Sequence, residues 1–351
     1  MNFWKHTVKC ASSLCMAALL LVGCSDQVLN PDGSIGTRGD GNSVGETIAP
    51  AETQIPGQIS LETQASTGSS LVIGGNTPEE MFKDSPHVMH VEFLQTGESD
   101  SILLRMDDTV VLVDTADSDD YAALKAKLKG YGIDTIHHLI LTHFDNDHIG
   151  SAPSIIKDFG VEKIYAPDYV RDSGLYRNTM SEIEAKGEGT TLYRVTEDME
   201  INLDYGRLWI NSTHLYPSGE VLGHDSPDAA IEENNFSLIT SVYFGEVSLL
   251  LLGDAEEDRM AEFNALFADA AYPSYTLIKA PHHGSYDKNL GACLSAVRPR
   301  YCVVMTDMED KVEAGLVTSV RSAGAAAYYT YNGEIMFSTD GSATKRLLTQ
   351  K

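Results

Sequence analysis

Short apolar segments recur along the chain from residue 87 onward and predict a protein rich in β-strands. The runs are rich in Val, Ile, Leu, Tyr and Phe and are bounded by Gly, Asp, Asn or Pro, a pattern typical of strands. We predict strands at residues 88–94, 102–105, 110–113, 136–141, 162–166, 208–215, 237–244, 247–252, 275–279, 301–305 and 334–338.

Segments with apolar residues three and four positions apart predict helices between these strands. Leu124 and Leu128 form such a stripe in residues 121–129. Strands and helices that alternate from residue 87 to the last residue favour a single α/β domain with a sizeable core. Further helices are expected at 153–159, 256–267 and 289–297, and the polar stretch 171–190 is expected to be an insertion over the cleft, helical in part.

The start of the chain has the pattern of a secretory signal. Lys5 and Lys9 precede an apolar run, 17–22, which is shorter than the ~20 residues that a membrane span needs. The run ends in Leu-Val-Gly-Cys24, which resembles a bacterial lipobox. We therefore expect a lipoprotein signal peptide at 1–23 and an extracytoplasmic protein anchored to the bacterial membrane through lipid on Cys24. An ordinary signal peptide that is cut elsewhere is the alternative.

Residues 24–86 are expected to form a disordered tether between this anchor and the folded domain at 87–351. Gly, Ser, Thr, Pro, Gln and acidic residues dominate the stretch, and aromatic residues are nearly absent. Such a composition cannot bury enough apolar surface to offset the chain entropy lost on folding.

Acidic residues outnumber basic ones by 51 to 25, and the formal net charge is −26. A polyanion is repelled by such a surface, and no Lys/Arg cluster offers it a basic stripe. Acidity therefore disfavours nucleic acid as a substrate without excluding it. Cys293 and Cys302 are expected to be buried and have no chemical role.

The densest candidate chemistry follows the predicted strand 136–141. Two imidazoles and two carboxylates would repel one another or stay unpaired if they were buried without a cation. A solvated acidic turn would explain the carboxylates but not the imidazoles that surround them. We therefore predict a metal site that includes His143, Asp145, Asp147 and His148.

The pattern His-x-Asp-x-Asp-His resembles the signature of the metallo-β-lactamase superfamily, in the variant of ComEC-type competence hydrolase domains. Further matching stretches follow the same order and hold Asp100, Asp114, Asp254 and the run from Lys279 through His282 and His283 to Ser285. This resemblance covers roughly residues 88–348. It implies an α/β fold of the αββα type, a four-layer sandwich in one domain, and a metal-dependent hydrolase.

The resemblance also implies two divalent metal ions, Zn²⁺ or Mn²⁺, that hold a hydroxide between them. It assigns His143 and Asp145 to a first ion, and Asp147, His148 and His282 to a second ion, with Asp254 bridging the two. Asp147 would also orient the hydroxide and so be catalytic. Asp114 is expected to support a ligand histidine through its other ring nitrogen.

Two adjacent histidines compete for one ligand position, and neighbouring side chains point in different directions. Relatives often have an aromatic residue before the glycine, so we expect His282 to bind metal. His283 is then expected to be catalytic, either stabilising an oxyanion or protonating a leaving oxygen. Ser285 is expected to bind substrate in a small anion nest.

The chain departs from the family pattern at residues 232–237, where another histidine ligand of the first ion is usual. This region reads Glu-Glu-Asn234-Asn235-Phe-Ser. Losing an imidazole shifts the site toward harder ions such as Mn²⁺ or Mg²⁺. Asn234 or Asn235 is expected to complete the site or bind substrate, and His214 and His224 are alternatives.

Three functions agree with these features. The preferred one is a phosphodiesterase that acts on a small or cell-surface phosphodiester, because the ComEC-type resemblance and an oxygen-rich site favour phosphoryl chemistry. An amide or lactone hydrolase, including a β-lactamase, is the second. A metal-binding surface protein without turnover, in which the first-ion position is incomplete, is the third.

Overall fold

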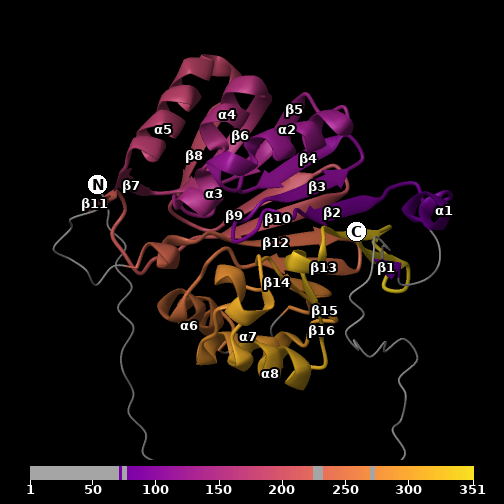
Figure 1. Cartoon of the computed structure of the whole chain (residues 1–351). Helices are drawn as coiled ribbons and strands as arrows, with labels where there is room; N and C mark the ends of the chain where they lie inside the picture. The colour runs from indigo at the N-terminus through magenta and orange to yellow at the C-terminus, as the bar shows by residue number, and fades with distance from the viewer. Residues whose placement is uncertain (1–70, 73–76, 224–231, 269–272) are drawn as a thin grey trace, which may run out of the picture. The chain divides into compact units, whose positions relative to one another are not determined.

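The computed structural model describes residues 71–72, 77–223, 232–268 and 273–351 (Figure 1). All of them belong to one unit, residues 65–351. The expected signal peptide, Cys24, most of the expected tether, and His224 lie outside the described residues. Within the described ranges, no helix is both long and apolar enough to cross a membrane.

Nine strands of the described chain form one mixed sheet, in the order β1-β18-β17-β2-β3-β4-β5-β6-β8. The pairs from β1 to β4 are antiparallel, whereas β4, β5, β6 and β8 run parallel. The strands are β1 (Leu71–Val72), β2 (Met89–Phe93), β3 (Ile102–Met106), β4 (Thr109–Val113), β5 (Thr135–Ile140), β6 (Gly160–Pro167), β8 (Thr191–Val195), β17 (Ile335–Thr339) and β18 (Arg346–Gln350).

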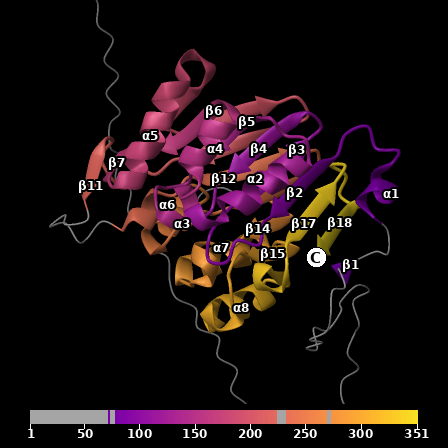
Figure 2. The ribbon, with the colours of Figure 1, turned by 45° about the horizontal axis from the view of Figure 1, so that its top comes forward.

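A second sheet contains seven of the described strands, in the order β16-β15-β14-β13-β12-β10-β9. They are β9 (Met199–Leu203), β10 (Gly206–Asn211), β12 (Ile239–Phe244), β13 (Val247–Leu251), β14 (Leu277–Lys279), β15 (Tyr301–Val304) and β16 (Ala326–Tyr329). A small parallel pair, β7 (Tyr169–Asp172) and β11 (Glu220–Gly223), stands apart beside α5 (Figure 2).

Alternating apolar residues explain why the two sheets pack face to face. Val91, Leu104 and Leu249 point into the space between the sheets and are fully buried. Each such side chain contributes ~1.5–3 kcal/mol when it leaves water. The inner faces of both sheets therefore form one apolar core.

Helices cover both outer faces and complete four layers, αββα (Figure 1). Above the first sheet lie α2 (Tyr121–Gly130), α4 (Ala152–Asp158) and α5 (Gly174–Lys186), whose apolar stripes meet the outer face. On the second sheet lie α6 (Glu257–Ala265), α7 (Lys288–Val297) and α8 (Ala314–Ser322). The predicted fold class is confirmed.

Folded structure begins earlier than the boundary predicted at residue 87. Helix α1 (Pro78–Phe82) starts at Thr77, which forms a capping box with Glu80. Phe82 is buried, and Ser85 Oγ donates a hydrogen bond of 2.9 Å to Asp340 Oδ2. These long-range contacts, invisible to composition, fix the last part of the expected tether.

The polar stretch 171–190 does contain a helix, but α5 packs beside α4 on the outer layer (Figure 2). The first residues of the stretch 171–190 belong to β7 instead, and this strand brings Arg171 to the loop after β5. Helix α5 also contacts α3 (Asn146–Ile149), in the loop after β5, so the stretch borders that loop, and its place over the cleft stays a prediction.

Candidate metal centre

The ligand-bearing loops follow the ends of strands in both sheets. The loop after β5 carries His143 to His148, and its last part folds into the short helix α3 (Asn146–Ile149). Asp254 follows β13, and the two histidines follow β14 in a 3₁₀ turn, His282–Gly284. Because β5 and β13 belong to facing sheets, their loops meet at one edge of the sandwich.

Unusual backbone conformations place these side chains. Asp114 and His283 have φ angles of 56° and 50°, in the left-handed region that is costly for residues with a Cβ atom. Gly253 has φ 54°, and a Cβ there would lie 3.1 Å from Cβ of Ser237. The turn before Asp254 therefore requires glycine.

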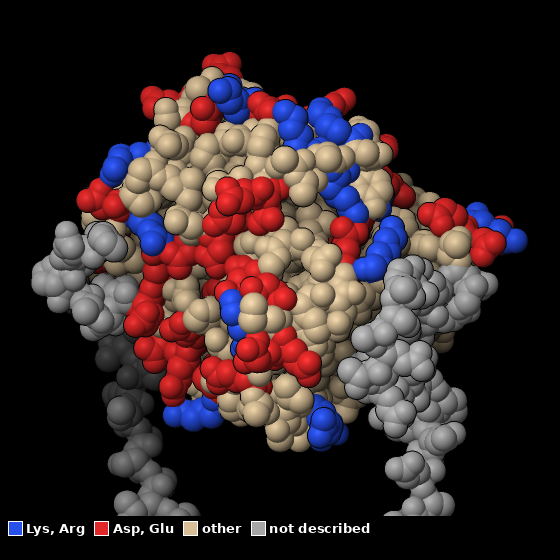
Figure 3. All heavy atoms as spheres, in the orientation of Figure 1, with Lys and Arg blue, Asp and Glu red and all other residues tan. Residues whose placement is uncertain are grey.

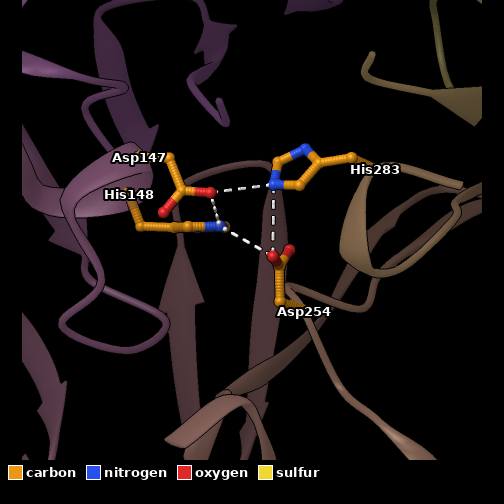
Figure 4. A group of neighbouring side chains, drawn as sticks. All are labelled: Asp147, His148, Asp254 and His283. Atoms are coloured by element: carbon orange, nitrogen blue, oxygen red, sulfur yellow. Dashed lines mark hydrogen bonds and ion pairs between the residues drawn. The ribbon is translucent and has the colours of Figure 1, made fainter. Parts of the chain in front are cut away.

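Four side chains, which we call the central cluster, converge at this edge: Asp147, His148, Asp254 and His283 (Figure 4). Nε2 of His283 lies 3.0 Å from Oδ2 of Asp147 and 3.2 Å from Oδ2 of Asp254. Nε2 of His148 lies 3.1 Å from the same oxygen of Asp254. One potential ligand atom from each of the four residues lies within 4.8 Å of the others.

The other ring nitrogens of both histidines are held by the protein. Nδ1 of His148 donates to Oδ2 of Asp114 at 2.8 Å, and Nδ1 of His283 donates to the carbonyl oxygen of Met305 at 3.1 Å. Asp114 also accepts hydrogen bonds from the backbone and hydroxyl of Thr142. Fixing Nδ1 in this way turns Nε2 toward the centre, as is usual for metal-binding histidines.

The pair expected to bind the first ion, His143 and Asp145, which we call the first-ion position, lies beside this cluster. His143 is fully buried, and its Nε2 lies 3.5 Å from Oδ2 of Asp145. The other oxygen of Asp145 forms an ion pair with Arg171. Although Asp145 occupies the N-cap of α3, its side chain does not cap the helix.

The charges of the central cluster are strongly coupled. Burial alone would lower the pKa of His283, but Asp254 and Asp147 outweigh it and raise that pKa to about 10. Burial also disfavours a charged His148, yet Asp254 and Asp114 raise its pKa well above the usual value. Burial opposes ionisation of Asp254, but both imidazoles keep its pKa well below normal. Without a metal ion, protons on the two imidazoles supply the positive charge.

Lys279 and Asp100 lie in the stretches that resemble the family, but the sequence assigned neither of them a role, and in the structure both are buried beside the site. Nζ of Lys279 forms an ion pair with Asp100, donates to the carbonyl of Gly253 at 2.9 Å, and lies 3.5 Å from Oδ1 of Asp254. Neither side chain reaches solvent appreciably. The sequence feature that could have pointed to Lys279 is its position at the end of an apolar strand, just before the histidine pair.

The structure reverses the positions expected for the two adjacent histidines. His283 is buried and joins the central cluster, whereas His282 has a side chain 36% exposed and lies 3.1 Å from Oε1 of Glu256. Both residues have left-handed backbone, φ 45° and 50°, and in this turn the second imidazole points into the cluster, which the comparison with relatives did not indicate. His283 thus has the ligand geometry, and His282 faces the cleft.

Asn234 and Asn235 lie in the 3₁₀ turn Glu233–Phe236 and make different contacts. Asn235 is buried, and its Oδ1 accepts from the backbone nitrogen of Arg259, so in the structure it supports α6. Asn234 donates to Glu256 at 2.9 Å, while its Oδ1 is a buried atom without a hydrogen-bond partner. His214 is exposed and its backbone nitrogen contacts Glu262, away from the cluster.

A polar cleft opens beside the central cluster. It has a volume of about 230 Å³ and is lined by Glu98, Asp147, His282, His283, Ser285 and Lys311. A neighbouring hollow of about 250 Å³ shares two of these residues and is lined by Ala255, Glu256, Glu257, Pro281, His282, Ser285, Tyr286 and Asp287. Ser285 therefore lines both hollows.

The donor set fits a divalent ion. Nε2 of His143 and Nε2 of His148 are buried atoms that form no hydrogen bond. Such atoms are costly unless something else binds them. Imidazole nitrogen and carboxylate oxygen are ligands that suit Zn²⁺ and Mn²⁺. The central cluster supplies both types of atom in one place, and Asp147 keeps an open side toward the cleft.

Comparisons with known proteins agree with this geometry. A model of the metallo-β-lactamase superfamily matches residues 94–305. ComE operon protein 3 of Bacillus subtilis (strain 168) is 26% identical over 177 residues, which are 50% of this chain and 21% of that protein. The chain therefore spans about a fifth of the length of this curated relative.

Two solved structures are also similar. The metallo-β-lactamase fold protein YhfI from Bacillus subtilis has a TM-score of 0.47 at 12% identity, covering 72% of this chain and 100% of YhfI. Igni18, a metallo hydrolase from Ignicoccus hospitalis, has a TM-score of 0.42 at 15% identity, covering 71% of this chain and 98% of Igni18. Since the family model matches more than half of its residues, the chain belongs to the metallo-β-lactamase superfamily and carries the candidate metal-binding residues of a metal-dependent hydrolase.

Proposed function

We propose that this chain is a phosphodiesterase that acts outside the cytoplasm on a small or cell-surface phosphodiester. The observation that carries the proposal is the central cluster, where two Nε2 atoms and two carboxylates converge next to a polar cleft. Bound divalent ions would polarise a phosphoryl group there and lower the pKa of a water molecule.

Residues at the cleft suit the remaining parts of such a reaction. The side chain of Asp147 is 34% exposed, so its carboxylate can orient a water molecule and accept its proton. His282 lies on the rim, and its hydrogen bond to Glu256 raises its pKa. A protonated His282 can donate to the leaving oxygen. Lys311, also in the cleft lining, pairs with Glu98 and Asp307, and a phosphate oxygen would have to compete with these carboxylates for its charge.

Charge around the cleft favours a small substrate over a nucleic acid. Asp and Glu gather in a broad patch between α3 and α7 on the face shown in Figure 3. The lining of the two hollows is mainly acidic and includes Glu98, Glu256, Glu257 and Asp287. Lys311 is the one lysine among the described residues that line them. A long polyanion would meet repulsion along this surface. A short diester needs only local neutralisation, which metal ions would provide.

A substrate panel tests the proposal. Full-length protein, purified in detergent and loaded with Mn²⁺ or Zn²⁺, is assayed with bis-p-nitrophenyl phosphate, p-nitrophenyl phosphate, nitrocefin and a lactone. We expect turnover of the diester above the monoester, and its loss in Asp254→Ala. Turnover of nitrocefin or lactone without the diester would favour an amide or lactone hydrolase. Bound metal without turnover of any substrate would favour the non-catalytic alternative.

Membrane anchoring through Cys24 is a separate part of the proposal and rests on the lipobox resemblance. Two or more acyl chains on one residue hold a protein stably at a membrane. Cys24→Ala is expected to move the protein from the detergent phase to the aqueous phase and leave turnover of the purified protein unchanged. Detergent-phase partitioning of the variant would contradict the anchor.

A further inference from the structure

Arg171 places a positive charge where the first metal ion is expected. Its Nη1 forms an ion pair with Oδ1 of Asp145 and lies 2.5 Å from Oε2 of Glu233. The same nitrogen donates to the carbonyl oxygen of Phe144 at 3.2 Å. One guanidinium therefore joins two carboxylates beside the buried imidazole of His143.

Several contacts hold β7, the strand that carries Arg171, beside the metal loop. Arg171 belongs to β7, which pairs with β11. Its neighbour Tyr169 is 1% exposed, donates to Oε1 of Glu233 at 2.5 Å, and accepts from the backbone nitrogen of Phe144 at 2.7 Å. The ring of Tyr169 also packs against Phe144, with centroids 4.6 Å apart. Strand β7 is thus tied to both Glu233 and the metal loop.

The ligand set at this position is incomplete while Arg171 is in place. Among the described residues, no third His, Cys, Asp or Glu joins His143 and Asp145 in a group close enough to hold an ion. Glu233 lies near enough to interact electrostatically with both. Its carboxylate is held by Tyr169 and Arg171 instead. Nε2 of His143 remains without a hydrogen-bond partner.

We propose that Arg171 is a positioning residue that serves as an internal cation at the first-ion position, so that the two metal positions fill in order. The central cluster binds the first equivalent of metal. The second equivalent goes to the pair His143 and Asp145, which we named the first-ion position after the family's first ion. This second equivalent binds more weakly, because it must displace the guanidinium from Asp145 and Glu233 and meets its positive charge. When Arg171 withdraws, Glu233 is free to supply the missing carboxylate. This inference concerns metal occupancy, and it holds whether or not the substrate is a phosphodiester.

Calorimetric titration of metal-free, full-length protein with MnCl₂ tests the order of binding. Wild type is expected to bind one equivalent tightly and a second more weakly. In Arg171→Gln the weaker equivalent should bind about tenfold tighter or more, because a like charge and a competing donor are gone. Arg171→Lys keeps the charge and should resemble wild type. Arg177→Gln, which removes an exposed ion pair with Asp172, is the matched control and should not change binding.

A second variant keeps the test decisive. The gain in Arg171→Gln should disappear in the double variant Arg171→Gln/Glu233→Gln, because the carboxylate that replaces the missing imidazole is lost. If metal-free Arg171→Gln is too unstable to titrate, thermal unfolding is followed against MnCl₂ concentration. Added Mn²⁺ should then raise its melting temperature more than that of wild type, as tighter binding requires.

Three results would overturn the inference. Weaker binding of the second equivalent in Arg171→Gln would mean that Arg171 holds Asp145 ready for the ion. Unchanged binding would mean that Arg171 has no influence on the position. Two equally tight equivalents in wild type would exclude ordered filling altogether.

Discussion

The two halves of the candidate metal centre balance their negative charge in different ways. In the central cluster, two imidazoles face two carboxylates, and the histidines hold protons that a metal ion would displace. At the first-ion position, Nε2 of His143 forms no hydrogen bond, and the carboxylate of Asp145 is neutralised by Arg171. A proton leaves an imidazole easily as a metal ion binds, whereas a guanidinium keeps its charge and must move away. The two positions should therefore differ in metal affinity.

Their supports differ as well. Asp114 and the carbonyl of Met305 orient the histidines of the central cluster, and Nζ of the buried Lys279 lies 3.5 Å from Oδ1 of Asp254. The first-ion position has Asn234-Asn235 where the family usually supplies a histidine, and one of these amides is committed to α6. Hydrogen bonds from the protein thus orient the ligands of the central cluster, whereas at the first-ion position Arg171 pairs with Asp145.

Replacing the expected bridging carboxylate should have the largest effect. Asp254→Ala removes the residue that both cluster histidines contact, so the protein should lose bound metal after dialysis. Turnover should fall by roughly 10³-fold, more than the about 10–100-fold that loss of an outer support costs. Metal analysis and diester kinetics measure both effects. Asp258→Ala, on the exposed side of α6, is the control, and normal metal content in Asp254→Ala would show that the bridge is misassigned.

Lys279→Met should lower the free energy of unfolding by about 3–5 kcal/mol, because Asp100 would stay buried without its cation. Urea unfolding of the metal-free protein measures this loss. The double variant Lys279→Met/Asp100→Leu should recover part of it, since no unpaired charge remains. A loss below about 1 kcal/mol in the single variant would mean that water reaches Asp100 and that the support is weaker than its burial implies.

Lowering the pH should weaken metal binding gradually, with a smaller effect than either substitution above. The folded, metal-free His283 has a pKa raised to about 10, above its unfolded value, so the proton stabilises this form fully below about pH 6.5 and less as pH rises toward 10. A metal ion must displace that proton. Apparent Mn²⁺ affinity should therefore rise by about tenfold per pH unit for each proton displaced, between pH 6.5 and 8.5. Affinity that is independent of pH would contradict protonation of the cluster.

Much of the fold could be predicted because its inner strands are largely apolar, as in β4 and β13. The strands that were missed lie at or near the edges of the sheets. Strand β9, at the edge of the second sheet, alternates half-buried apolar residues with exposed polar ones over only five positions, and β18 depends on pairing with β17. Helix α8 has only two buried residues, Leu316 and Val320, four positions apart, and its other residues do not extend this stripe.

The metal loop was visible because its ligands are local in sequence, whereas the supports and the arginine are not. Lys279 meets Asp100, and Arg171 meets Asp145, only after strands from distant parts of the chain have paired. The histidine pair shows a second limit. Which of His282 and His283 points inward depends on a left-handed turn that no side-chain pattern announces.

Metal content of the two histidine variants tests the central claim most directly. His283→Ala should lose the tighter equivalent of metal, because it removes one of the two Nε2 atoms of the central cluster. His282→Ala should keep both equivalents, since that side chain lies on the rim of the cleft with Glu256. Both proteins are dialysed with wild type against Mn²⁺ and analysed by mass spectrometry. Normal metal in His283→Ala together with metal loss in His282→Ala would contradict the assignment of the central cluster as the metal site.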